Sequence, residues 1–406
     1  MQQQNKKISR TGYLRKMLWC IGLVILVQVL KKMLISFLPA ALLFHTLMLT
    51  GLQVAILLFT ILHLLFTRLS FFKKILLVVL IISIPGFFFN YWLQRPSKIP
   101  VAFKPALQKY YTNVEVNIIQ FNPNTSSYDS LLFYTLKPSA SFVFNNREFA
   151  DSFQTNSKGL RDDEVSLVKP PIICLGDSYA MGWGVKQHES FAEQMAMLTN
   201  QKVLNAAVSS YSTGRELECL SRLNSSNLQY LIIQYCRNDN IENKDFVENN
   251  YTLRISSREK YDSAVNKHYW TKLWFPGKRV ITISKLYAEK KWQIFPTVRK
   301  HVPGNIQEAA RYFTDILMHS GINFKKTKVL VVDVSEQERM NDDFVNAVNK
   351  LLEANSYKER FSNNLIMVPL SGLLNKDDYY ILDLHIRASG HRKIAERLSS
   401  YIISKN

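Results

Sequence analysis

The first 110 residues contain no aspartate or glutamate, and this asymmetry constrains the fold more than any other feature. Fourteen lysines and arginines lie between Lys6 and Lys109, and the first acidic residue is Glu115. Apolar side chains dominate from Met17 to Leu93. Because a helix needs about 20 apolar residues to cross a bilayer, this stretch has room for about three spans. We therefore expect residues 1–93 to form a membrane anchor. Its predicted transmembrane helices are 17–38, 43–67 and 75–93.

The positions of the basic residues predict how these spans are oriented, because basic loops favour the cytoplasmic side of a membrane. Five basic residues precede the first span: Lys6, Lys7, Arg10, Arg15 and Lys16. Arg68, Lys73 and Lys74 mark a second cytoplasmic turn. A third crossing then delivers the chain after Trp92 to the outside. The expected location is the inner membrane, as a multi-pass protein with its soluble domain in the periplasm.

Two alternatives to this topology stay open. Lys31 and Lys32 lie well inside the first span. If that span only lies along the membrane interface, the chain crosses twice and the soluble domain faces inward. The other alternative is a cleaved signal peptide, but the apolar region is several times longer than the apolar part of such a peptide.

The remaining 296 residues carry 37 basic and 32 acidic side chains, a balance that is ordinary for a soluble domain. Fourteen of the +19 net charges therefore lie in the first quarter of the chain, around its apolar spans, which predicts a lipid bilayer as partner and gives no reason to expect nucleic acid. The cysteines and histidines lack the spacing of a metal site, and no nucleotide-binding glycine motif occurs. We expect neither a metal nor a cofactor.

After a juxtamembrane linker over 94–140, the rest of the chain alternates apolar, β-branched runs with amphipathic stretches. The predicted strands are 171–175, 203–206, 231–235, 329–334 and 365–368. The predicted helices are 189–199, 214–224, 306–319, 341–354 and 388–403. Strands that are apolar on both faces and alternate with helices favour a parallel sheet that is covered on both sides. The expected fold class is α/β, a three-layer sandwich with a five-stranded parallel sheet over residues 141–406. Residues 240–305 interrupt this rhythm, and we interpret them as an insertion that faces the substrate, such as a lid.

Ser178 is the candidate nucleophile, because it follows the first predicted strand within Gly176-Asp177-Ser178. A ligand site in such a fold lies at the carboxyl ends of the strands. Near the start of the next helix, backbone N–H groups could stabilise an oxyanion. A Gly-Asp-Ser triplet alone is a weak signal, since helix capping explains most occurrences.

Two further segments could complete such a site. Asp383 and His385 precede the last predicted helix, where the carboxylate could orient the imidazole and His385 could act as general base. Asn238 follows the third predicted strand, and its side-chain amide could donate to a developing oxyanion. The simpler interpretation of each residue is a helix cap or a turn.

Together these segments resemble the SGNH hydrolases, also called the GDSL family. The resemblance extends to Phe149–Arg161, Gly182–Val185 and Asn205–Thr213, which are similar to blocks of members encoded with envelope-polysaccharide genes. It implies an SGNH-like, flavodoxin-like fold with Ser178, His385 and Asp383 as catalytic residues. The implied oxyanion donors are the N–H groups of Ser178 and Ser210 and the amide of Asn238.

Two departures from the family pattern stand out. Ser210 occupies a position where the family usually has glycine, so a Cβ sits where glycine permits close approach or a positive φ. Only Leu384 separates Asp383 from His385, whereas many members have two intervening residues.

The predicted function is that of a serine esterase or O-acyltransferase acting on acyl esters, O-acetyl groups above all, of an envelope or exported glycan. A membrane acyltransferase is a further expected partner. The alternatives are a lipid esterase or thioesterase, and a non-catalytic envelope assembly protein that retains the fold.

Overall fold

The computed structural model describes residues 42–66, 69–275, 277–292, 305–336 and 340–403, together with residues 18, 22, 25, 26 and 29. The chain divides into two compact units. The first unit consists of Met1–Glu115 and His268–Phe295, and the second of Val116–Lys267 and Pro296–Asn406. The second unit is therefore interrupted in sequence by a segment that folds with the N-terminal unit.

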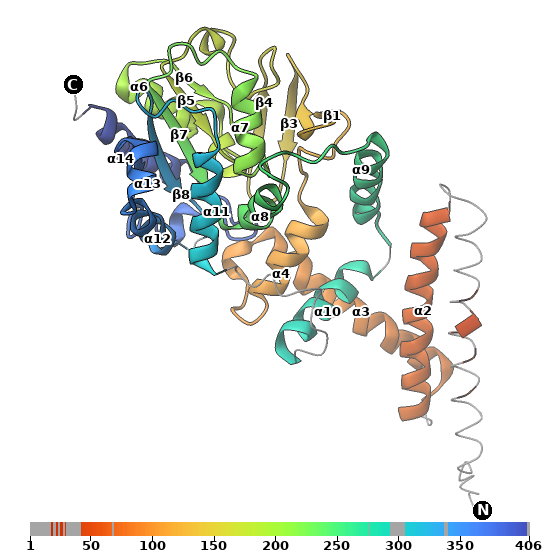
Figure 1. The fold of residues 1–406 in the computed structure, drawn as a ribbon. Helices are drawn as coiled ribbons and strands as arrows, with labels where there is room; N and C mark the ends of the chain where they lie inside the picture. The colour runs from red at the N-terminus through yellow and green to blue at the C-terminus, as the bar shows by residue number, and fades with distance from the viewer. Residues whose placement is uncertain are drawn as a thin grey trace, which may run out of the picture. The chain divides into compact units, whose positions relative to one another are not determined.

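The first unit is helical in its described part (Figure 1). Its α-helices are α2 (Leu42–Leu65), α3 (Phe71–Gln94), α4 (Lys104–Tyr110) and α10 (Lys278–Trp292). A 3₁₀ turn, Pro96–Lys98, follows α3, and a π-helical turn, Tyr111–Glu115, follows α4. Helix α3 packs against α2, and α10 packs against both α3 and α4.

Among the described residues, α3 is the one helix that is long and apolar enough to cross a membrane, with a mean hydropathy of 2.1 over its most apolar stretch. It coincides with the third predicted span, 75–93. Helix α2 coincides in position with the second, 43–67, but only a shorter apolar helical stretch, Gln53–His63, is found there. The first predicted span lies almost wholly outside the described residues, so the multi-pass topology stays a prediction.

The core of the second unit is a five-stranded parallel sheet, which confirms the predicted α/β fold class. Its strands are β5 (Ile172–Leu175), β6 (Val203–Asn205), β7 (Tyr230–Tyr235), β8 (Lys328–Asp333) and β9 (Leu365–Met367). They lie in the order β6-β5-β7-β8-β9, the doubly wound order of flavodoxin-like folds. Because the order reverses direction at β5, the loops after β5, β6 and β7 meet at one edge of the sheet, where a ligand site is expected.

Helices cover both faces of this sheet (Figure 1). On one face α6 (Phe191–Thr199) packs against α14 (Ala388–Ile403). The other face carries α7 (Thr213–Ser221), α8 (Asn240–Glu248), α11 (Ile306–Met318), α12 (Asp343–Leu352) and α13 (Asn355–Phe361). Right-handed crossovers in opposite directions from β5 place the two groups of helices on opposite faces.

Two β-hairpins precede the sheet in the chain. Strand β1 (Ser126–Asp129) pairs with β2 (Phe133–Leu136), and β3 (Ser141–Asn145) pairs with β4 (Ala150–Gln154). The remaining short elements are α5 (Ser178–Met181) and the 3₁₀ turns Val165–Leu167, Gln187–Glu189, Arg237–Asp239 and Lys376–Asp378.

The segment 240–305 is mostly helical in its described part, although its sequence shows no strand-helix rhythm. It contains α8, α9 (Arg258–Lys272) and α10. Polar and aromatic residues are mixed around α9, so it lacks the apolar stripe by which helices are detected in a sequence. The interpretation of this segment as a lid stays a prediction.

Candidate active site

The turn after β5 places Ser178 at the start of a one-turn helix. Gly176 has φ 151°, and a Cβ added there would lie 2.6 Å from the Cβ of Ala180, so the position requires glycine. The carboxylate of Asp177 accepts a hydrogen bond of 2.9 Å from the Tyr179 N–H and thereby caps helix α5. Ser178 is the first residue of that helix and is partly exposed, which leaves its hydroxyl accessible.

The structure brings Ser178, His385 and Asp383 into one hydrogen-bonded chain. The Oγ atom of Ser178 lies 2.7 Å from Nε2 of His385, and Nδ1 of His385 lies 2.5 Å from Oδ1 of Asp383. If Nδ1 of a neutral imidazole donates to the carboxylate, Nε2 is left to accept the proton of the serine hydroxyl. The Asp383 side chain is buried, whereas the His385 side chain is 21% exposed, so solvent and substrate can reach the imidazole.

The surroundings of His385 favour its protonated form. Burial by itself would lower the pKa of His385, but attraction to Asp383 and the hydrogen bond between them outweigh it, and the pKa is raised above its usual value. The second carboxylate oxygen, Oδ2 of Asp383, accepts from Nε1 of the buried Trp183 at 3.4 Å. A cation that forms on the imidazole is thus stabilised by a fixed carboxylate.

The short spacing between Asp383 and His385 is accommodated by the backbone of Leu384. Leu384 has φ 70°, a left-handed conformation that is uncommon for a residue with a branched side chain. The chain on its C-terminal side turns back so that the Tyr380 N–H donates to the carbonyl of His385 at 2.9 Å. One intervening residue therefore suffices for both side chains to meet, at the expense of local backbone strain.

Glu148 holds the segment that leads into Asp383, a role for which the sequence offered no signal. Its carboxylate accepts hydrogen bonds from the N–H groups of Ile381 (2.8 Å), Leu382 (2.7 Å) and Asp383 (2.9 Å). Burial raises the pKa of Glu148, while the three N–H groups act in the opposite direction. Glu148 is a positioning residue, since it fixes the backbone that carries Asp383.

Arg161 fixes the turn that follows α5. Its guanidinium is fully buried and lies 3.7 Å over the ring of Phe153. It donates to the carbonyls of Met181 (3.2 Å), Val185 (2.7 Å) and Gly182. Burial lowers the pKa of Arg161 to about 10, so it stays charged near neutral pH. The segment 149–161, which resembles the family's lead-in block, thus supplies a structural clamp for the chain next to Ser178.

The two other predicted oxyanion donors lie on loops that are attached to the Gly176-Asp177 turn. The Val208 N–H, in the loop that leads to Ser210, donates to the carbonyl of Gly176 at 3.1 Å. The exposed side chain of Asn238 donates from Nδ2 to Oδ2 of Asp177 at 3.5 Å. Ser210 itself has φ 60°, the left-handed conformation that explains why glycine would be favoured there. Its side chain is oriented by Gln120, whose Nε2 donates to the Ser210 Oγ at 3.0 Å.

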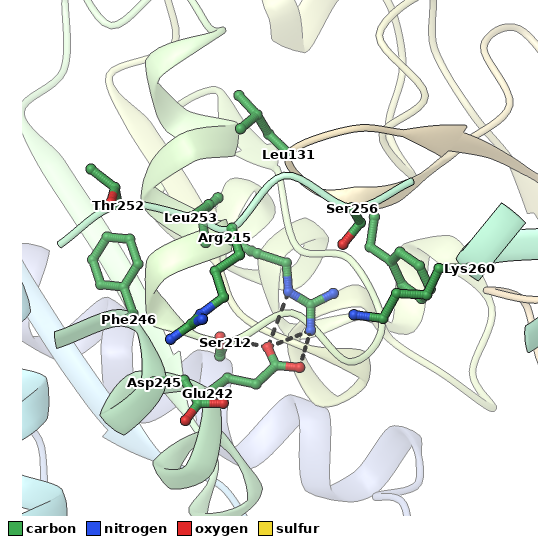
Figure 2. A pocket seen from close by; sticks show the side chains of 12 residues that line it. Leu131, Ser212, Arg215, Glu242, Asp245, Phe246, Thr252, Leu253, Ser256 and Lys260 are labelled. Atoms are coloured by element: carbon green, nitrogen blue, oxygen red, sulfur yellow. Dashed lines mark hydrogen bonds and ion pairs between the residues drawn. The ribbon is translucent and has the colours of Figure 1, made fainter. Parts of the chain in front are cut away.

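A surface cavity of about 300 Å³ adjoins the loop that carries Ser210 (Figure 2). Arg215 and Glu242 line it and form a forked ion pair, and Oγ of Ser212 donates to the same carboxylate at 2.8 Å. Arg215 also donates to the carbonyl of Ser210 at 2.7 Å, so the lining of the cavity and the predicted oxyanion loop are connected. Lys260 contributes a positive charge to the lining.

The arrangement of hydroxyl, imidazole and carboxylate can activate a serine for attack on an acyl carbon. In the described ranges, no group of three or more His, Cys, Asp or Glu side chains is placed to hold a metal ion.

The sequence matches no protein-family model and no curated protein. Solved structures with a similar arrangement include a G-D-S-L-family lipolytic protein from Desulfitobacterium hafniense DCB-2, with 12% identity over 56% of this chain and 97% of that one and a TM-score of 0.28. A carbohydrate esterase has 13% identity, coverage of 59% and 66%, and a TM-score of 0.32. The lipase Lip_vut3 from a goat rumen metagenome has 14% identity, coverage of 56% and 94%, and a TM-score of 0.28. Values this low do not assign a function to the chain.

Proposed function

We propose that the protein is a serine esterase or O-acyltransferase with Ser178 as its nucleophile. The observation that carries the proposal is the continuous chain from the Ser178 hydroxyl through the His385 imidazole to the Asp383 carboxylate, with links of 2.7 and 2.5 Å. Serine is a weak nucleophile until a neighbouring base removes its proton, and this geometry supplies the base and the group that orients it.

In the proposed reaction, Nε2 of His385 takes the hydroxyl proton while Ser178 Oγ attacks the acyl carbon. The resulting oxyanion is stabilised by the N–H groups of Ser178 and Ser210 and by the amide of Asn238. His385 then returns the proton to the leaving alcohol as the acyl-serine forms. Water or a sugar hydroxyl, deprotonated by the same imidazole, attacks the acyl-serine and regenerates the enzyme.

The proposed substrate is an acyl ester, above all an O-acetyl ester, of an envelope or exported glycan. The cavity next to Ser210 combines charged side chains with the aromatic residues Phe133 and Phe246, a lining that suits a sugar with polar and apolar faces. An anchor that crosses the inner membrane would hold the catalytic unit in the periplasm. A membrane acyltransferase partner would supply the acyl group if the reaction runs toward transfer.

The direct test is covalent labelling with a fluorophosphonate probe, which reacts only with an activated serine. The wild-type chain and Ser226→Ala, a control at an exposed serine, are expected to label equally. The variant Ser178→Ala is expected not to label, with an unchanged circular dichroism spectrum. Equal labelling of Ser178→Ala would remove Ser178 from the mechanism, and an unlabelled wild type would favour a non-catalytic assembly protein.

Substrate class is then tested by incubating the wild-type chain with O-acetylated glycans and with unacetylated acceptors. Free acetate measured against transferred acetate, by mass, separates hydrolysis from transfer. Turnover of phospholipid or thioester substrates in place of the glycan would instead favour the lipid esterase or thioesterase.

A further inference from the structure

The segment 268–292 returns to the apolar helix α3, although it lies within the sequence of the catalytic unit. A Cβ on Gly277, at the start of α10, would lie 3.7 Å from Cγ2 of Ile82, and a Cβ on Gly86 would lie 3.4 Å from Cγ2 of Val280. Nearer the C-terminal end of α3, Arg279 donates to Oδ1 of Asn90 at 2.7 Å. The N-terminal part of α10 therefore runs along α3. The turn before α10 contacts α3 at Ile82, further from the C-terminal end of α3 than the other two contacts.

The contact at Ile82 is deep along α3. With a rise of 1.5 Å per residue, the 24 residues of α3 measure about 36 Å, and Ile82 lies about 18 Å from its C-terminal end at Gln94. A hydrocarbon core is about 30 Å thick, so a spanning α3 extends beyond it by only about 3 Å at each side. The turn between α9 and α10 then lies about 15 Å below the nearer boundary of the core.

The cations nearest the turn, Lys278 and Arg279, are satisfied by acceptors within the first unit. Nζ of Lys278 donates to the carbonyls of Thr271 (2.6 Å) and Leu273 (2.7 Å). Arg279 pairs with Oε1 of Glu115 at 2.7 Å as well as with Asn90. Internal partners of this kind are what non-helical backbone and charged side chains require at membrane depth, where no water is available.

Near the turn, over the described residues of 268–280, the exposed side chains are both aromatic. Trp274 is 69% exposed and Tyr269 is 59% exposed, whereas the neighbouring Phe275 is buried. Large exposed aromatic side chains beside a spanning helix suit lipid contact, because they bury apolar area without leaving polar groups unpaired. A sugar could also stack on Trp274, but the depth of the turn along α3 favours acyl chains.

We propose that the turn between α9 and α10 is re-entrant: it enters the outer leaflet beside α3, with Trp274 in contact with lipid acyl chains. The proposal rests on the membrane placement of α3 and is independent of the chemistry at Ser178. The catalytic unit then has a second attachment to the bilayer, supplied from within its own sequence.

Cysteine accessibility tests this placement in open membrane sheets, where both surfaces meet the reagent. Three single variants are compared with the unsubstituted chain: Trp274→Cys, Val79→Cys on α3, and Val101→Cys, whose parent residue is 88% exposed beyond the end of α3. The described native cysteines, Cys174, Cys219 and Cys236, are all buried. Because the reaction needs water and a thiolate, a water-soluble maleimide is expected to label positions 79 and 274 at least about tenfold more slowly than 101. All three label equally in SDS.

The controls distinguish the two ways of failing. If position 274 labels as fast as 101 while 79 stays protected, α3 spans the membrane but the re-entrant turn is wrong. If 79 also labels fast, α3 does not lie in the bilayer, and the membrane placement fails together with this inference. Fluorophosphonate labelling of Ser178 reports separately on the catalytic proposal.

A second measurement separates lipid contact from shielding by protein. An environment-sensitive fluorophore attached to the thiol of the Trp274→Cys variant is expected to be quenched more by lipids spin-labelled along the acyl chain than by lipids labelled at the head group. Stronger quenching from the head group, or none from either lipid, would overturn the proposal.

Discussion

Replacing Glu148 by glutamine tests whether one carboxylate positions the segment that carries Asp383. Glutamine keeps the shape of the side chain but turns one acceptor oxygen into a donor. In the structure Oε2 accepts from two N–H groups, those of Leu382 and Asp383, and Oε1 accepts from the Ile381 N–H. A glutamine whose oxygen still accepts from Leu382 and Asp383 therefore places its NH₂ group against the Ile381 N–H.

The expected loss follows from these three bonds. A hydrogen bond to a charged group contributes about 1.5–3 kcal/mol, and Glu148→Gln loses one bond outright and the charge on the other two. Burial raises the pKa of Glu148, so desolvation of the carboxylate outweighs the gain in charge from the three N–H groups, and the expected loss comes mainly from the Ile381 N–H that is left without an acceptor. We expect a loss of about 2 kcal/mol in the free energy of unfolding. Displacing Asp383 by about 1 Å would slow the reaction about a hundredfold.

The assay is the rate of fluorophosphonate labelling, measured together with the thermal midpoint of the detergent-solubilised chain. Glu353→Gln, at an exposed glutamate, is the matched control and should change neither quantity. If Glu148→Gln lowers the midpoint but labels at the wild-type rate, Glu148 contributes to stability alone and the positioning argument is wrong.

Three further changes have expected outcomes. The labelling rate should rise with pH through a pKa above 6.5, because the imidazole must be neutral to act as base, and Asp383→Asn should lower that pKa because the attraction that raises the pKa of His385 is lost. Burial lowers the pKa of His391 to about 3, so below pH 6.5 the unfolded chain binds more protons than the folded chain. Lowering the pH therefore lowers the free energy of unfolding, by about 2 kcal/mol at pH 5. His391→Gln should remove this loss in acid denaturation curves, and His188→Gln, at an exposed histidine, should not. Ser210→Gly should keep the labelling rate and shift the free energy of unfolding by less than about 1 kcal/mol. Glycine relieves the left-handed conformation of residue 210, and this offsets the added freedom of the unfolded chain. A large loss of labelling would mean that the Ser210 side chain itself positions the loop.

The sequence was sufficient to predict the sheet and the residues that meet at its edge, because those residues immediately follow strands or precede a helix. Ser178 and Asn238 each come directly after an apolar run that forms a central strand. Parallel strands bring their carboxyl ends together whatever the loops contain, so proximity follows from topology alone.

Glu148 and Arg161 could not be predicted in the same way, because their partners are backbone groups. A carboxylate that binds three N–H groups more than 230 positions away, or a guanidinium that binds carbonyls, leaves no pattern of complementary side chains in the sequence. The left-handed conformation of Leu384 was equally hidden, since no glycine or asparagine marks it. Tertiary contacts impose these features, and a local pattern does not report them.

The division of the chain has a consequence for proteolytic separation of its two units. The backbone passes between the two units near residues 115, 267 and 295, so three separate peptide segments join them. A protease that cuts only near residue 115 leaves the second unit covalently bound to 268–292, whose helix α10 still packs against α3 and α4. A single cleavage between the units therefore cannot separate the second unit from the first, as it can where one stalk joins two domains.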